Sequence, residues 1–171
     1  PGASTVMGGT GGSGVVIISL TKNSLTINAG SGAVNISGGV TNLSGISVST
    51  SSTIRVSSAS DLTVNSPITW SSASSLTLAA VGNIFINASI TNSGGSGNLN
   101  IFYGDTDGTK APTSGKSYSI NLANSPSITL AGGASTLKIG NTAYTILRTA
   151  ADLASVATTG KYALGNSISL A

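Results

Sequence analysis

Few side chains in this sequence could hold a metal ion or transfer a proton. The 171 residues include four acidic side chains, all Asp, and lack His and Cys. The one close pair, in Asp105-Thr106-Asp107-Gly108, has the form of the opening of a calcium loop, because hard cations prefer alternating carboxylates and a glycine bend. The distal Glu of such a loop is absent, and Asp-Gly is an ordinary turn signal. The segment therefore predicts a turn, with Asp105 and Asp107 as secondary candidates for metal binding.

The sequence also offers few groups that could support nucleophilic catalysis. A serine nucleophile needs a base within hydrogen-bonding reach, and without His only Lys or Asp could serve. Asp61 takes a repeat position that is Asn83 in the next copy, which predicts a ladder at a corner rather than a catalytic carboxylate. The Gly-rich segment 8–14 precedes a strand, and no helix follows, so it predicts an arm rather than a phosphate cradle. We expect no enzymatic activity and no cofactor.

The segments that carry these residues repeat along the chain. Residues 61–70 recur twenty-two positions later as 83–92, with apolar residues on apolar residues and Asn65 on Asn87. A third copy, 33–42, aligns Val34 with Leu62, and its six extra residues predict a longer loop around Ile46. A companion segment precedes each copy, at 24–28, 53–57 and 75–79, and a fourth companion lies at 98–102.

Short alternating segments joined by small residues predict a β-solenoid. Periods in the twenties are typical of solenoids, whose units must stack to bury their apolar faces. In Leu-Thr-Val-Asn or Ile-Phe-Ile-Asn alternate residues face one way, and the segments are too short for helices. The prediction is an all-β parallel β-helix with about three short strands per turn of roughly 22 residues. Leu62, Val64, Ile84 and Ile86 should stack in adjacent rungs inside it.

Composition favours one elongated, packed domain. Hydrophobic residues make up 39% of the chain and charged residues 6%, and the alternating placement of the apolar residues argues against disorder. The net charge of +3 comes from scattered cations, and the aromatic residues do not interleave with them, so we expect no nucleic-acid binding. The longest apolar run, 15–18, is far shorter than the roughly twenty residues of a membrane-spanning helix, so we expect no membrane insertion.

Residues 75–92, followed by a Gly-rich corner and Asn98-Leu99-Asn100-Ile101, resemble the repeats of the filamentous haemagglutinin family. These are large exoproteins that Gram-negative bacteria export by the two-partner secretion pathway. The likeness covers roughly residues 24–103, and residues 144–170 are similar to a non-repeat insert of the same exoproteins. The resemblance implies a right-handed parallel β-helix, a secreted or cell-surface location in a Gram-negative bacterium, and an adhesive or structural role. The family's N-terminal secretion region is missing, so we expect an internal part of a longer protein.

Past residue 104 the regular spacing loosens. Segment 104–117 is polar and predicts a loop that leaves the solenoid wall, and strands are predicted at 118–122, 127–130 and 136–139. Thr149 and Asp152 form an Asp variant of the capping box, which predicts a short helix over 150–157 that ends before Gly160. Leu153 and Val156 should face the body of the protein. The predicted organisation is a Gly-rich arm at 1–14, solenoid repeats at 15–147, and an end cap or junction at 148–171.

Two surface features stay open at this point. Trp70 takes the repeat position of Asn92, so it is predicted either to lie at a strand end, with its ring exposed for a protein or sugar contact, or to be partly buried under a loop. Asn35, Asn42 and Asn87 begin Asn-x-Ser sequons, which chance explains in a chain rich in Asn and Ser. The family resemblance implies glycosylation at these sites as the alternative.

The pattern favours an extracellular structural or adhesive fibre segment. The alternative is a glycan- or ice-binding solenoid, which regular outward Thr pairs on every rung would favour. The outward pairs vary between Thr26/Asn28, Arg55/Ser57 and Thr77/Ala79, which favours the fibre.

Assembly end to end is expected from terminal strands that no predicted helix covers. One copy would add a strand to the next, in a heterologous contact that propagates into a filament. The apolar residues expected at this contact are Val15, Val16, Ile17, Ile18, Ile168 and Leu170. The expected partners are further copies of the chain and a glycan or protein on a host or neighbouring cell.

Overall fold

The computed structural model describes residues 4–7, 25–30, 34–38, 46–50, 53–70, 73–94, 96–105, 111–165 and 168. Strands predominate in this part of the chain, accompanied by one short α-helix and one 3-10 helix. The strands are β1 (Ser4–Met7), β2 (Leu25–Gly30), β3 (Val34–Gly38), β4 (Ile46–Thr50), β5 (Ile54–Ser58), β6 (Leu62–Val64), β7 (Ile68–Trp70), β8 (Ser75–Ala80), β9 (Ile84–Ile86), β10 (Ile90–Asn92), β11 (Asn98–Tyr103), β12 (Tyr118–Ile120), β13 (Ile128–Leu130), β14 (Leu137–Ile139), β15 (Thr142–Leu147) and β16 (Tyr162–Leu164). The helices are the 3-10 helix η1 (Leu122–Asn124) and α1 (Ala150–Ala154).

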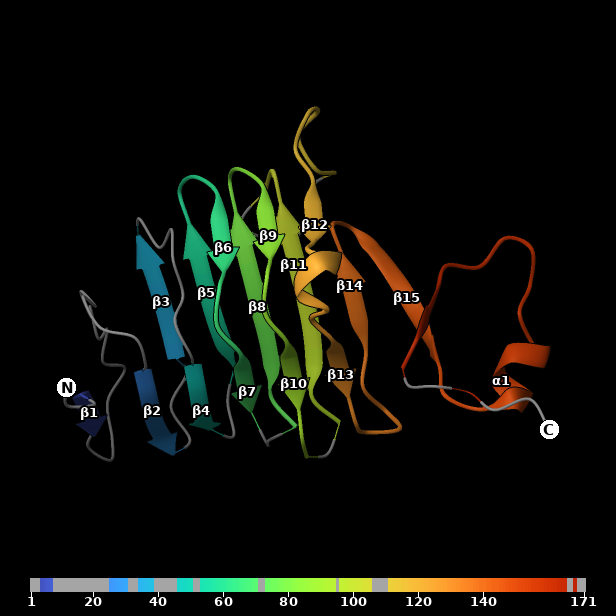
Figure 1. The fold of residues 1–171 in the computed structure, drawn as a ribbon, viewed down its shortest axis with the longest axis horizontal. Coiled ribbons are helices and arrows are strands. Elements are labelled where there is room, and N and C mark those ends of the chain that lie inside the picture. The colour runs from blue at the N-terminus through green and yellow to red at the C-terminus, as the bar shows by residue number, and fades with distance from the viewer. Residues whose placement is uncertain are drawn as a thin grey trace.

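The strands form three sheets, and the strands of each sheet lie side by side along the long axis of the molecule (Figure 1). Their orders are β1-β2-β4-β7-β10-β13, β16-β15-β14-β11-β8-β5-β3 and β12-β9-β6. Consecutive strands along the chain belong to different sheets. As a result β5 pairs in parallel with β8, β6 with β9, and β7 with β10. Leu62 lies beside Ile84 and Ile68 beside Ile90, which confirms the predicted stacking of the two copies. The architecture is that of a parallel β-solenoid.

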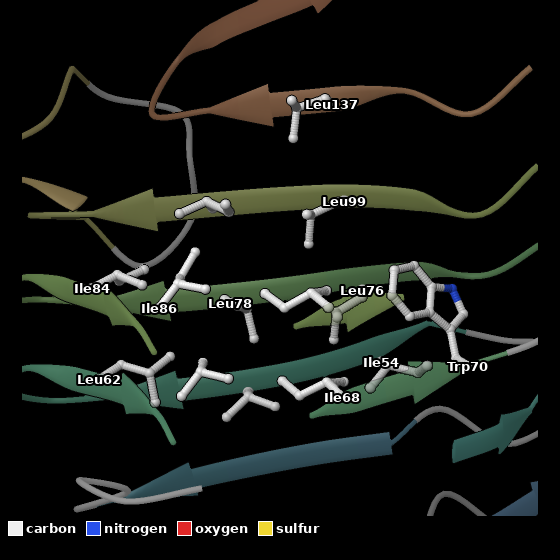
Figure 2. Close-up of a cluster of buried hydrophobic side chains, with 14 of the residues drawn as sticks. Ile54, Leu62, Ile68, Trp70, Leu76, Leu78, Ile84, Ile86, Leu99 and Leu137 are labelled. Atoms are coloured by element: carbon white, nitrogen blue, oxygen red, sulfur yellow. The ribbon is translucent and has the colours of Figure 1, made fainter. Parts of the chain in front are cut away.

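Alternation along each strand separates the core from the outer wall. Ile54 and Val56 of β5 are 1% and 0% exposed, whereas Arg55 between them is half-buried. Leu62, Val64, Ile84 and Ile86 have no exposed surface, as predicted. Figure 2 shows the apolar side chains of successive rungs lying one above another inside the solenoid. Stacking of this kind removes apolar surface from water on both sides of each rung, which is the main favourable term of folding.

The alignment of the third copy, 33–42, with 61–70 is wrong. Val34 of β3 pairs with Ile54 of β5, and so lies in a different sheet from Leu62. Ile46 of β4 pairs with Leu25 of β2 on one side and with Ile68 of β7 on the other. Ile46 therefore lies in a strand rather than in a loop. Every wall of a solenoid has the same alternation of buried and outward residues, so the pattern does not predict which sheet a strand joins.

The parallel stacking predicted up to residue 147 ends at β14. β12, β13 and β14 occupy the three predicted strand segments, each shorter than expected. Gly140, with φ of +59°, then reverses the chain, a conformation that glycine adopts without steric cost. β15 returns antiparallel to β14, with Leu137 beside Tyr144, and β16 pairs in parallel with β15.

The capping box of the predicted helix is confirmed. Thr149 Oγ1 accepts from the backbone N–H of Asp152 at 3.0 Å, and Asp152 Oδ2 accepts from the backbone N–H of Thr149 at 3.0 Å. Helix α1 ends at Ala154, earlier than predicted. Leu153 and Val156 are 38% and 44% exposed, and α1 buries none of its residues, so their predicted inward orientation is wrong. The helix is held by its cap and not by apolar packing.

Candidate functional site

Trp70 is not a surface contact. Its side chain is 2% exposed and lies at the end of a row of core side chains (Figure 2). The indole Nε1–H donates to the carbonyl oxygen of Ser74 at 3.0 Å, so the polar edge of the ring is satisfied inside the protein. The exposed alternative is therefore wrong, and the ring is enclosed more completely than the partly buried alternative expected. The period of two could have shown this, because Trp70 faces the same way as buried Ile68.

Of the remaining predicted site residues, the structure describes only Asp105 and Ile168. Asp105 is half-buried and forms an isolated antiparallel bridge with Ala80, whereas Asp107 lies outside the described residues. No group of three His, Cys, Asp or Glu side chains that could hold a metal ion occurs within the described ranges. Of the expected assembly residues, Ile168 is half-buried, and Val15, Val16, Ile17, Ile18 and Leu170 lie outside the part of the chain that the structure describes.

Polar side chains form ladders at the corners of the solenoid. Asp61 Oδ1 accepts from the backbone N–H of Asn83 at 2.7 Å, and Asn83 Oδ1 accepts from the backbone N–H of Ser117 at 3.0 Å. Asn87 Nδ2 donates to Asn65 Oδ1 at 2.7 Å. The predicted corner role of Asp61 is thereby confirmed: its carboxylate ties one rung to the next.

The outer wall of the seven-stranded sheet carries similar ladders. Asn98 Nδ2 donates to Ser75 Oγ at 3.3 Å, and Asn98 Oδ1 accepts from Thr136 Oγ1 at 2.8 Å, so one amide joins three rungs. One row further along the strands, Asn100 Nδ2 donates to Thr77 Oγ1 at 3.2 Å. These outward groups bond to one another and stiffen the wall.

The six-stranded sheet presents a different wall. Its strand register aligns one hydroxyl residue per strand in a single row, which we call the hydroxyl row: Thr5, Thr26, Ser47, Thr69, Thr91 and Thr129. Thr69 is exposed, and Thr91 and Thr129 are half-buried. The side-chain hydroxyls of these three make no hydrogen bond to another residue in the described ranges. The hydroxyl row was not predicted, because it appears only when outward residues are aligned across strands and not along one strand.

Arg148 occupies the edge of β13. In earlier rungs of the same sheet, the carbonyl oxygen of Trp70 accepts from the N–H of Ser93 at 3.0 Å, and that of Asn92 accepts from the N–H of Ala131 at 3.3 Å. Leu130 stands in the same register column, and its carbonyl oxygen accepts from Arg148 Nη2 at 3.4 Å. The same Nη2 donates to the carbonyl oxygen of Gly132 at 2.8 Å. A guanidinium thus takes the place of the backbone donor that a next strand would supply.

Two titratable groups of the C-terminal region have shifted pKa values. The backbone N–H of Arg148 donates to Asp152, and this bond, helped by the Thr149 side chain, lowers the pKa of the Asp152 carboxyl below its ordinary 3.8. Burial raises the pKa of Tyr118, and the neighbouring Tyr144 and Tyr103 hydroxyls raise it further. The rings of Tyr103 and Tyr118 lie 5.6 Å apart between centroids. Asp152 therefore stays ionised at neutral pH, whereas Tyr118 stays neutral.

Comparison of the chain with family models, curated proteins and solved structures gives no significant match. Within the described residues, none of the helices has the length and apolar character needed to cross a membrane.

Proposed function

We propose that this chain is an extracellular structural and adhesive fibre segment of a bacterial surface or secreted exoprotein. The observation that carries the proposal is the continuous parallel stacking of strands, reinforced by side-chain ladders such as Ser75–Asn98–Thr136. A right-handed β-helix of about three strands per turn of roughly 22 residues, as in the filamentous haemagglutinin exoproteins, fits that stacking. The proposed location is the surface or surroundings of a Gram-negative cell.

The stacking suits a load-bearing rod. Each added rung lengthens the solenoid by about 4.8 Å, the spacing of hydrogen-bonded strands, while its cross-section stays constant. Adjacent rungs are joined by backbone bonds and by side-chain bonds at the corners, such as Asn87 to Asn65. A rod held by repeated nearest-neighbour contacts gains length without a larger core.

End-to-end assembly is part of the proposal, with further copies as one partner and a cell-surface glycan or protein as the other. Light scattering over a concentration series, with electron microscopy of the same samples, tests it. We expect elongated particles whose length grows with concentration. Particles that stay monomeric at the highest concentration exclude assembly, and beads coated with the chain that fail to bind any of a panel of cells exclude adhesion.

The hydroxyl row favours a second candidate function, a glycan- or ice-binding module. Neutral hydroxyls repeated at about the 4.8 Å strand spacing suit a hydroxylated polymer or ordered water. Replacing Thr69 or Thr91 with Lys should abolish binding to insoluble polysaccharide or the thermal hysteresis of ice binding. Thr77→Lys on the seven-stranded sheet is the matched control. Equal behaviour of the Thr69 and Thr77 variants excludes the row as a binding face.

A further inference from the structure

The edge of β13 has the geometry of an acceptor for one more parallel strand. Successive residues of a strand direct their N–H and C=O groups to opposite neighbours, and the backbone of Ser127 and Ala131 bonds to β10. The carbonyl of Leu130 therefore points away from β10, toward the position of a next strand, whereas the carbonyl of Gly132, beyond the end of β13, accepts from the N–H of Ser135 at 3.1 Å in a turn. Arg148 Nη2 donates to both of them.

The region after β15 holds Arg148 in this place. Asp152 Oδ2 accepts from the backbone N–H of Arg148 at 2.9 Å, and Arg148 Nη1 donates to the carbonyl oxygen of Ile146 at 3.4 Å. Since α1 buries none of its residues, its contribution is not to the apolar core. The capping box of this short helix instead fixes the backbone from which the guanidinium reaches β13.

Strand β1 of a second copy could place a backbone N–H where Arg148 now donates to the Leu130 carbonyl. It forms the opposite edge of the same six-stranded sheet, and Val6 stands in one register column with Ile27, Val48, Trp70, Asn92 and Leu130. In two rungs of this column the donor to the preceding carbonyl is the residue that follows the column position: Ser93, after Asn92, donates to Trp70, and Ala131, after Leu130, donates to Asn92. The corresponding donor in β1 is the N–H of Met7.

We propose that the β13 edge is a strand-acceptor site for β1 of a second copy, and that Arg148 occupies this site until the copy binds. The N–H of Met7 then takes the Leu130 carbonyl oxygen from Arg148 Nη2. This is parallel strand addition through a heterologous contact. It rests on the end-to-end assembly proposed above and specifies the surfaces: it joins one wall of the solenoid, because β15 already covers β14.

The experiment measures the concentration at which the full chain associates, by sedimentation and light scattering. Arg148→Ala removes the competing donor, and since hydrogen bonds from a charged group are the stronger ones, it should lower that concentration about ten-fold or more. Arg148→Lys keeps the charge but loses the second nitrogen, Nη1, which bonds to the Ile146 carbonyl while Nη2 bonds to Leu130 and Gly132, and it should give a smaller effect. Arg55→Ala, at a half-buried arginine on the seven-stranded sheet, is the matched control and should change nothing.

Met7→Pro tests the occupant. It removes the N–H that would bond to Leu130 and leaves the pairing of Val6 with β2 intact, because proline is tolerated where an edge N–H faces outward. In the Arg148→Ala background it should restore the original association concentration. Circular dichroism of each variant shows whether it is folded.

Two results overturn the inference. If Arg148→Ala and Arg148→Lys both lower the melting temperature without promoting association, Arg148 braces a single chain and blocks no acceptor. If association rises but Met7→Pro does not reverse it, β1 is not the occupant. Failure of the proposed end-to-end assembly gives a different result: the wild-type chain stays monomeric at every concentration. The inference about Arg148 is tested by comparing the association concentrations of the Arg148 variants with one another.

Discussion

The repeat region, residues 53–105, and the C-terminal region, residues 111–165, use similar short strands but are stabilised differently. In the repeat region the inward side chains have almost no exposed surface, as Ile54, Leu76 and Leu99 show at 1%, 0% and 0%. In the C-terminal region Ile120 and Ile146 are only partly buried against the same core. A rung between two others is covered on both sides, whereas β12, which carries Ile120, pairs with β9 alone.

Polar contacts compensate in the C-terminal region. Arg148 bonds to carbonyls of the β13 edge, Asp152 accepts two backbone N–H groups, and the Tyr162 hydroxyl accepts from the N–H of Ala157 at 2.8 Å. The comparison indicates that repetition stabilises the middle of the solenoid through burial, while its C-terminal end depends on individual hydrogen bonds. Four substitution experiments can break or sharpen that conclusion.

Ile84→Ala should have the largest effect. Ile84 is completely buried between two rungs, so its truncation should cost roughly 2–5 kcal/mol, as large-to-small core changes do. Ile120→Ala, in the partly covered β12, should cost about 1 kcal/mol, because less apolar surface is lost. Urea titration measures both. Thr63→Ala on the outer wall is the control, expected within about 0.5 kcal/mol of wild type. Equal costs at Ile84 and Ile120 would contradict the difference in burial between the two regions.

Gly82→Ala should have the next largest effect. A Cβ at Gly82 would lie 2.8 Å from the backbone nitrogen of Asp61, in the neighbouring rung, so the corner would have to shift. Overpacking of this kind costs about 1–3 kcal/mol. Gly133→Ala is the matched variant: a Cβ there meets no heavy atom within 4 Å, so the change should be neutral or slightly stabilising. Thermal melting distinguishes the two, and a similar loss at both glycines would mean that rung spacing does not constrain the corner.

Trp70→Phe should cost about 1–2 kcal/mol, because it keeps an aromatic ring but leaves the Ser74 carbonyl without the indole donor. Trp70 is the only tryptophan, so its fluorescence reports on this site alone. Emission of the native chain should be blue-shifted and poorly quenched by acrylamide. A red-shifted, readily quenched signal would contradict the burial of the ring.

Asp152→Asn should have the smallest effect, and it should depend on pH. The folded-state pKa of Asp152 lies below the ordinary 3.8, so the contribution of its carboxylate is complete above pH 3.8 and is lost as pH falls through the folded value. Protection of the α1 amides from hydrogen exchange should therefore decline in acid in the wild type and stay level in Asp152→Asn. Amides of β8 serve as the control. A parallel decline in both chains would mean that Asp152 does not control the cap.

Local patterns in the sequence account for the middle of the molecule. The match between 61–70 and 83–92 predicted the stacking of Leu62 on Ile84, because a constant repeat length leaves only one register. It also aligned Asn65 with Asn87, which the structure joins by a hydrogen bond. The capping box of α1 was equally predictable, since it needs only Thr149 and Asp152 three residues apart. The burial of Trp70 was also available from its period-two relation to Ile68.

Tertiary structure decided the remainder, because these features depend on contacts between segments whose distance along the chain varies. Val34 joins Ile54 rather than Leu62, because β3 lies in the seven-stranded sheet and Leu62 in the three-stranded one. The antiparallel return of β15 and the reach of Arg148 to Gly132 follow no repeat. Alternation determines which side of a strand is buried, and it is the same on every wall. The pairing of each strand with its neighbour is determined only when the whole chain has folded. The same holds for the group that bonds to the free edge of β13.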